Sequence, residues 1–168
     1  MELTKTVILN KVQISQRINR LAYQIYEDNL LEKELIIAGI AKSGYQFAKK
    51  IAESLKAISP LSVELIEIAI DKHGTDRKEI KLNVPNEKMK GKVIILVDDV
   101  LNSGKTMIDA LRPFLQADIK KIRTVVLVDR NHKRFPVAAD FVGHSLATTL
   151  QEHVTVDFEN GNEEAYLS

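Results

Sequence analysis

Apolar residues alternate along the chain between helical spacing and short continuous runs. Near the start, Ile14, Ile18, Leu21, Ala22 and Ile25 recur every three or four residues, which predicts an amphipathic helix over 14–29. The next apolar stretch, ELIIAGI (34–40), is continuous and short, as in a strand that is buried on both faces. The chain therefore opens with a helix followed by a buried strand.

The same alternation continues to the C-terminal part. Helices are predicted around 47–55 and 107–115, and strands over 61–70, 91–99 and 122–129, with a polar, glycine-bearing loop at 71–79. Two shorter strands are predicted within ADFVGHS and HVTVDF. Apolar strands that alternate with helices predict an α/β fold with a mostly parallel central sheet flanked by helices. At 168 residues, the chain is expected to form a single domain over 1–168.

Composition excludes several classes of protein. The chain has no cysteine, so disulfides and thiolate metal sites are excluded. No apolar run approaches the roughly 18 residues that span a bilayer, and the start lacks the apolar region of a signal peptide. We therefore expect a cytoplasmic protein with no membrane partner. The net charge of +1 favours no general binding to nucleic acid, although small basic clusters occur at 120–123 and 130–134.

Polar turns follow three of the predicted strands, at 41–44, 98–106 and 129–134. In parallel sheets, ligands bind where the carboxyl ends of strands meet the N-termini of helices. The polar loop at 71–79 is expected to lie at the same edge. This edge of the sheet is the predicted site.

The stretch VIILVDDVLNSGKT (93–106) carries the clearest chemistry. It is not a nucleotide-triphosphate loop, because the motif G-x-x-x-x-G-K-[ST] would need glycine where Asp99 stands. The turn that opens the following helix instead predicts a site for one phosphate, since it offers unpaired amides, two hydroxyls and a lysine. Its residues are Asn102, Ser103, Gly104, Lys105 and Thr106.

Two adjacent acids precede this phosphate turn. Asp98 and Asp99 can accept hydrogen bonds from paired ribose hydroxyls, so acids and turn together suit a ribose 5-phosphate. The alternative is that the two acids only cap the helix or form a surface turn.

The same stretch resembles the signature of the type I phosphoribosyltransferases, which bind 5-phosphoribosyl 1-diphosphate (PRPP). The segments TVILNKVQISQRINRLAYQIYEDN (6–29) and VVLVDRNHKRFPVAADFVGHSLATT (125–149) resemble, within that family, the bacterial pyrimidine-operon attenuation regulators, which are also uracil phosphoribosyltransferases. The resemblance implies the type I phosphoribosyltransferase fold, with a small hood built from the N- and C-terminal segments. It also implies transfer of the phosphoribosyl group from PRPP to a nucleobase, Mg²⁺ as cofactor, and a homo-oligomer, either a dimer or a tetramer.

The resemblance assigns roles to the residues that grip PRPP. Asp98 and Asp99 would be catalytic, holding the ribose 2- and 3-hydroxyls and Mg²⁺ directly or through water, and 102–106 would bind the 5-phosphate. Two residues of the 71–79 lid, Lys72 and Arg77, would reach the diphosphate. The remaining diphosphate-binding residues would be Ala41, Lys42, Ser43 and Gly44, for which the alternative is a plain strand–helix connection.

The base would be bound by later residues. Asp129 and Arg130 would lie in the base or hood region, Phe141 would stack on the base, and the backbone of Val142 would hydrogen-bond its edge. The alternative for Phe141 and Val142 is that they are ordinary strand residues in a small core.

Three positions depart from the related patterns. Ser43 stands where the regulators usually have arginine. Asn102 stands where purine transferases have an aspartate and the regulators a tyrosine. Because an amide takes no proton at neutral pH, Asn102 cannot accept a proton from the base. Asp129 stands where transferases for hypoxanthine and guanine have a lysine, and a carboxylate cannot donate to a 6-oxo group. This argues for uracil as the acceptor.

Three functions follow from these observations. The first is transfer of the phosphoribosyl group to uracil, giving UMP and diphosphate. The second is an RNA-binding attenuation regulator that senses PRPP or UMP with little or no catalysis. The third is a non-catalytic PRPP-binding module.

Overall fold

A six-stranded sheet forms the centre of the molecule. The computed structural model describes residues 4–71, 79–149 and 152–168. Its strand order is β4-β3-β2-β5-β6-β7, and β4 alone runs antiparallel, to β3. The bounds are β2 (Glu34–Ile40), β3 (Ser62–Asp71), β4 (Glu79–Leu82), β5 (Val93–Leu101), β6 (Lys121–Asp129) and β7 (Phe141–Ser145). The predicted mostly parallel sheet is confirmed.

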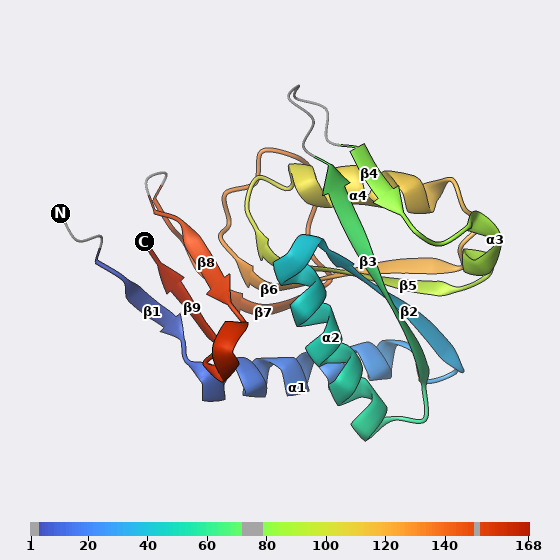
Figure 1. Cartoon of the computed structure of the whole chain (residues 1–168), viewed down its shortest axis with the longest axis horizontal. Helices are drawn as coiled ribbons and strands as arrows, with labels where there is room; N and C mark the ends of the chain where they lie inside the picture. Colours follow the sequence, from blue (N-terminus) through green and yellow to red (C-terminus); the bar gives the residue numbers. More distant parts are fainter. Residues whose placement is uncertain (1–3, 72–78, 150–151) are drawn as a thin grey trace.

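Helices cover the two faces of this sheet (Figure 1). One face packs against α1 (Lys11–Asp28) and α2 (Ala41–Ile58), and the other against α4 (Lys105–Leu115) and the short α3 (Asn86–Met89). Side chains of β5 alternate between the layers: Ile95 and Val97 belong to the first, and Ile94 and Leu96 to the second. This two-sided burial explains why the strands are continuous apolar runs rather than alternating ones.

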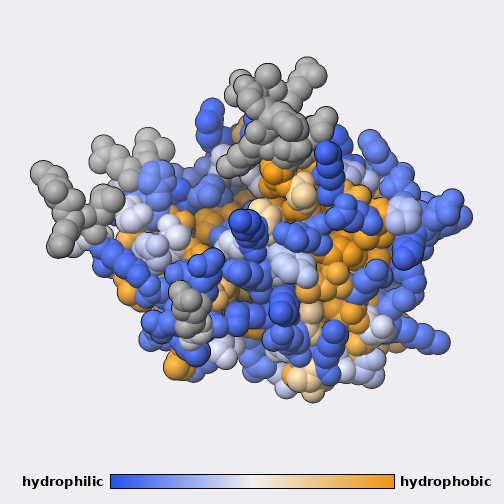
Figure 2. Space-filling model, in the orientation of Figure 1, coloured by the Kyte–Doolittle hydropathy of each residue, from blue (hydrophilic) through white to orange (hydrophobic). Residues whose placement is uncertain are grey.

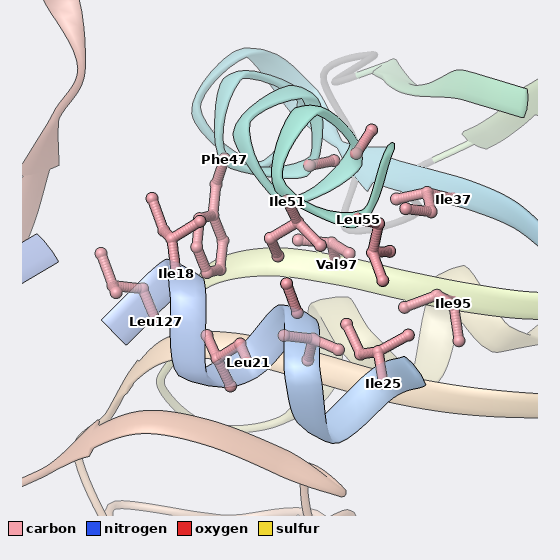
Figure 3. Packing of buried hydrophobic residues seen from close by; sticks show 14 of the residues in the cluster. Ile18, Leu21, Ile25, Ile37, Phe47, Ile51, Leu55, Ile95, Val97 and Leu127 are labelled. Atoms are coloured by element: carbon pink, nitrogen blue, oxygen red, sulfur yellow. The ribbon is translucent and has the colours of Figure 1, made fainter. Parts of the chain in front are cut away.

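The larger core lies between α1, α2 and the sheet. Figure 3 shows Ile18, Leu21 and Ile25 of α1 directed toward Phe47, Ile51 and Leu55 of α2, with the sheet beneath them. The five apolar residues of the predicted first helix are all buried. That helix begins at Lys11, earlier than its apolar pattern indicates, because Asn10 and Gln13 form a capping box.

A second, three-stranded sheet forms the hood that the family resemblance implies. Its order is β1-β9-β8, with β1 (Thr6–Leu9), β8 (Val154–Asp157) and β9 (Glu164–Leu167), and a single 3₁₀ turn η1 (Glu159–Gly161) joins β8 to β9. The N- and C-terminal segments therefore lie side by side, to one side of the central sheet (Figure 1). Phe158, which follows β8, stacks on Phe47 of α2 at a centroid distance of 5.9 Å, which fixes the hood to the main body.

The face of the molecule drawn in Figure 2 is largely hydrophilic. Figure 2 shows polar residues over most of one face, with apolar residues gathered mainly around its middle and right-hand part. Across the part of the chain that the structure describes, no helix has both the length and the apolar character needed to cross a bilayer.

Candidate active site

Strand β5 carries both acids within its length. It continues through Asp98 and Asp99 to Leu101, beyond the predicted end at residue 99. One carboxylate oxygen of Asp98 accepts from the amide of Asp99 (2.9 Å), and one of Asp99 accepts from the amide of Val100 (2.9 Å). Both side chains are half-buried. The backbone therefore orients the two carboxylates at the carboxyl end of the sheet.

The turn after β5 depends on a glycine in the left-handed region. Gly104 is the N-cap of α4 and has φ +91°, a conformation that side chains disfavour. A Cβ at this position would lie 2.4 Å from Cγ1 of Val137. The amides of the first turn of α4 have no intrahelical acceptors and lie at the positive end of the helix dipole, as an anion site requires.

The segment that follows β6 in the chain holds this turn in place. The backbone amides of Arg134 and Phe135 donate to the carbonyl of Ser103 at 2.9 and 3.1 Å. The hydroxyl of Ser103 in turn accepts from the amide of Lys105 at 3.3 Å. Sequence reasoning missed the support from 134–137, and the only local signal is the proline-containing F-P-V that follows the basic cluster.

Acids and turn enclose one small cavity. Its volume is about 120 Å³, and its lining residues are Asp98, Asp99, Val100, Leu101, Asn102, Ser103, Gly104, Thr106 and Met107. Six of these were predicted as site residues. Lys105, the seventh predicted residue of this stretch, is exposed and does not line the cavity.

The predicted diphosphate segment, 41–44, is the first turn of α2 rather than a separate loop. Helix α2 begins at Ala41 directly after β2, with no side-chain cap, and Ala41 itself has φ +54°. Gly44 lies against the acids, since a Cβ there would be 3.2 Å from a carboxylate oxygen of Asp98. The structure thus brings the backbone of this segment next to Asp98.

The side chains of the same segment point elsewhere. Lys42 and Ser43 line a different groove, of about 530 Å³, between α2 and the hood. The hydroxyl of Ser43 lies 3.5 Å from the carbonyl of Val156 in β8. Lys42 therefore borders the hood groove and is not among the residues that line the cavity at Asp98.

At the end of β6, Asp129 and Arg130 are both buried. Asp129 accepts from the amide of Asn131 at 2.9 Å and lies 3.7 Å from the ammonium of Lys133. In the sheet it is level with Leu101 of β5, so it borders the phosphate turn. Arg130 donates from Nη1 to the side-chain oxygen of Asn102 at 2.9 Å, and its other bonds reach the segment after β7.

The structure does not bring Phe141 and Val142 to this cavity. They begin β7 at the sheet edge, level with Val125 and Val126, whereas the site lies at the opposite end of β6 near Asp129. Both side chains pack partly buried against the core clusters, and the carbonyl of Val142 accepts from Arg20 at 2.7 Å. These positions fit the second interpretation, ordinary strand residues. Lys72 and Arg77 lie outside the described residues.

Asp140, the residue before Phe141, has a structural role that sequence reasoning missed. Its carboxylate accepts from the amide of Thr124 at 2.9 Å, and the hydroxyl of Thr124 accepts from the amide of Asp140 at 3.0 Å. This reciprocal pair joins the start of β7 to β6.

Comparison with known proteins places the chain in a family. Residues 6–159 match the family described as the phosphoribosyl transferase domain. The Bifunctional protein PyrR of Haemophilus ducreyi is 32% identical over 163 residues, covering 92% of this chain and 90% of the relative. The protein of the same name from Ligilactobacillus salivarius is 35% identical over 158 residues, covering 89% of each.

Solved structures agree in fold. A crystal structure of a hypoxanthine-guanine phosphoribosyltransferase from Bacillus anthracis matches with a TM-score of 0.75 at 21% identity, covering 89% of this chain and 86% of that chain. The predicted type I phosphoribosyltransferase fold is confirmed. Since the family match spans most of its length, the chain belongs to the phosphoribosyltransferase family.

Proposed function

We propose that the protein transfers the 5-phosphoribosyl group of PRPP to uracil, releasing diphosphate and forming UMP. The observation that carries this proposal is the cavity in which two oriented carboxylates meet the first turn of α4. A carboxylate pair accepts hydrogen bonds from the ribose hydroxyls, and the turn offers donors to the 5-phosphate. Family membership and the relatives named Bifunctional protein PyrR support the same activity.

The backbone at the start of α2 is proposed to hold the diphosphate. The first-turn amides of α2 have no intrahelical acceptors, and Gly44 permits close approach to Asp98. PRPP would then span the N-termini of two helices, with its diphosphate at α2 and its 5-phosphate at α4. Lys72 and Arg77 remain proposed partners of the diphosphate, from the segment that joins β3 to β4.

The donor set fits Mg²⁺. This ion is usually bound by one or two carboxylates together with substrate phosphates and water, and Asp98 and Asp99 supply such a pair. When bound, Mg²⁺ neutralises charge on the diphosphate.

The reaction exchanges one bond at C1 of the ribose. The bond from C1 to the diphosphate oxygen breaks with its electron pair leaving on diphosphate, while N1 of uracil forms the new bond and gives its proton to water. The sugar passes through an oxocarbenium-like state, as in glycoside hydrolysis. Asp98 and Asp99 would hold the ribose in position, and this positioning is where the chain contributes most. Asn102 is neutral and takes no part in proton transfer.

We choose uracil over a 6-oxopurine because the relatives are named Bifunctional protein PyrR and because Asp129 stands where transferases for hypoxanthine and guanine have a lysine. Asp129 lies beside the phosphate turn at the end of β6, where we propose that the base enters. An ionised carboxylate accepts hydrogen bonds and cannot donate to a 6-oxo group.

The test is diphosphate release from PRPP with Mg²⁺, measured with uracil, hypoxanthine, guanine, adenine and orotate. Turnover with uracil, reduced about 10²-fold or more by Asp98→Asn/Asp99→Asn, is the expected result. Asp118→Asn, an exposed acid after α4, is the matched control and should keep full activity. Turnover with a purine alone would overturn the choice of uracil. Tight PRPP binding without turnover would favour the non-catalytic module.

A second function, RNA binding, is favoured by one surface observation. Arg20 of α1 is exposed and donates to the carbonyls of Val142 and Gly143 in β7 at 2.7 Å, and burial, followed by Arg17 and Arg20, lowers the pKa of the neighbouring His144. We propose this basic face as the RNA-binding surface of an attenuation regulator. RNA affinity that falls steeply with salt, and falls further in Arg17→Gln/Arg20→Gln, would support it. Affinity that the double variant leaves unchanged would exclude this face.

A further inference from the structure

Arg130 holds a buried positive charge among uncharged partners. The residue is 7% exposed, and its guanidinium makes four hydrogen bonds, which use four of its five N–H donors. The acceptors are the side chains of Asn102 and Thr148 and the carbonyls of Thr149 and Glu152. All four are neutral oxygens.

These bonds connect two parts of the chain that are far apart in sequence. Asn102 lines the cavity at the N-terminal side of the phosphate turn, whereas Thr148, Thr149 and Glu152 belong to the segment between β7 and β8. Arg130 itself follows β6, and its amide donates to the carbonyl of Leu101 at 3.2 Å. Arg130 therefore contacts the end of β5 through its backbone and the phosphate turn through its side chain.

A buried charge is costly unless an opposite charge compensates it. The described residues supply Arg130 with hydrogen bonds but not with a carboxylate within ion-pair distance. The proposed phosphate lies on the other side of Asn102 and carries negative charge. This arrangement suits a cation whose electrostatic partner is the ligand.

We infer that Arg130 is a positioning residue for the 5-phosphate: it fixes Asn102 and the phosphate turn, and it stabilises the bound phosphate electrostatically from behind. This inference rests on the proposed function. Arg130 was expected in the base or hood region. The inference gives it a different role, because its guanidinium already donates to other residues of the chain. It also gives Asn102 a role, since its side-chain oxygen is the acceptor that transmits the contact.

The test uses two probes that occupy different halves of the site. Ribose 5-phosphate and inorganic diphosphate are titrated by calorimetry into the wild type and into Arg130→Gln, Arg130→Lys and Asn102→Ala. Arg130→Gln should lower the affinity for ribose 5-phosphate about tenfold to hundredfold and raise KM for PRPP by a similar factor. Its kcat and its affinity for diphosphate should change little. Arg130→Lys keeps the charge and should recover part of the loss. The double variant Arg130→Gln/Asn102→Ala should lose little more ribose 5-phosphate affinity than the weaker-binding of the two single variants, because the two residues act together.

The control is Arg123→Gln, which removes the same side chain at the other end of β6, where it pairs with Asp28. It should leave both affinities unchanged. If Arg130 only supported the fold, Arg130→Gln would weaken both probes together and lower the melting temperature, which would overturn the inference. Equal ribose 5-phosphate affinity in the wild type and Arg130→Gln would also overturn it. A wild type that binds neither probe would contradict the proposed function itself.

Discussion

Gly104 is the residue on which the geometry of the phosphate turn depends most directly. Its φ of +91° starts α4 at the correct angle, and its missing side chain makes room for Val137. The amides that face the cavity follow this residue, so a change here alters the anion site before it alters the rest of the fold.

We predict that Gly104→Ala lowers the free energy of unfolding by about 1–3 kcal/mol and raises KM for PRPP at least tenfold, because the methyl group would clash with Val137. Denaturant unfolding and steady-state kinetics measure the two effects. Gly91→Ala is the matched control: its φ is +71°, but a Cβ there meets nothing within 4 Å. Gly91→Ala should lower the free energy of unfolding by about 1 kcal/mol and leave KM for PRPP unchanged. Equal KM values in the two variants would contradict the proposed role of the turn.

The phosphate turn was predictable from sequence, whereas the surroundings of the base were not. Two acids after an apolar run and a glycine before a helix are local features, and local features set both the acids and the anion site. The family resemblance assigned Phe141 and Val142 to the base, but the pairing of β7 with β6 decides which end of the sheet they reach. Arg130 likewise depends on contacts with Thr148, Thr149 and Glu152, which no local pattern reveals.

Among the elements, the hood contacts α2 through an aromatic stack, an ion pair and the hydroxyl of Ser43. Lys50 of α2 donates to Glu163, just before β9, at 2.7 Å. The pKa of Glu163 lies below its ordinary value of 4.5, mainly because of this hydrogen bond. The strands β4 and β9 of the two sheets were not predicted, since four residues are too few to show a period.

The lowered pKa of Glu163 predicts a pH dependence. A carboxylate with a depressed folded pKa adds stability above its unfolded pKa, and this stability is lost as the pH falls through the folded value. The difference in unfolding free energy between the wild type and Glu163→Gln should therefore be about 0.5 kcal/mol at pH 7 and shrink below about pH 4. Denaturant unfolding across that range measures it, with the exposed Glu27→Gln as control. A difference that stays constant with pH would show that the ion pair is not its source.

At the scale of the whole molecule, one sheet couples two cores. Ile94 and Ile95 are neighbours on β5, both fully buried, yet they belong to opposite layers. Because every central strand contributes to both layers, neither core can open without disturbing the other.

We therefore predict one cooperative unfolding transition, in keeping with a single domain over 1–168. Ile94→Val and Ile95→Val should each cost about 0.5–1.5 kcal/mol and shift that same transition. Calorimetry, supported by circular dichroism and fluorescence, checks this. Two transitions, with each variant moving a different one, would divide the chain into two units.

The pairing of β1 with β9 has a consequence for synthesis on the ribosome. Thr6 pairs with Leu167, so the first strand to leave the ribosome cannot form its backbone hydrogen bonds until the last strand has been made. At about 5–20 residues per second, that wait lasts on the order of ten seconds or more. During it, the central sheet and the phosphate turn can already form, whereas the hood cannot. A nascent chain is thus expected to form the cavity at Asp98 and Asp99 before it forms the groove between α2 and the hood.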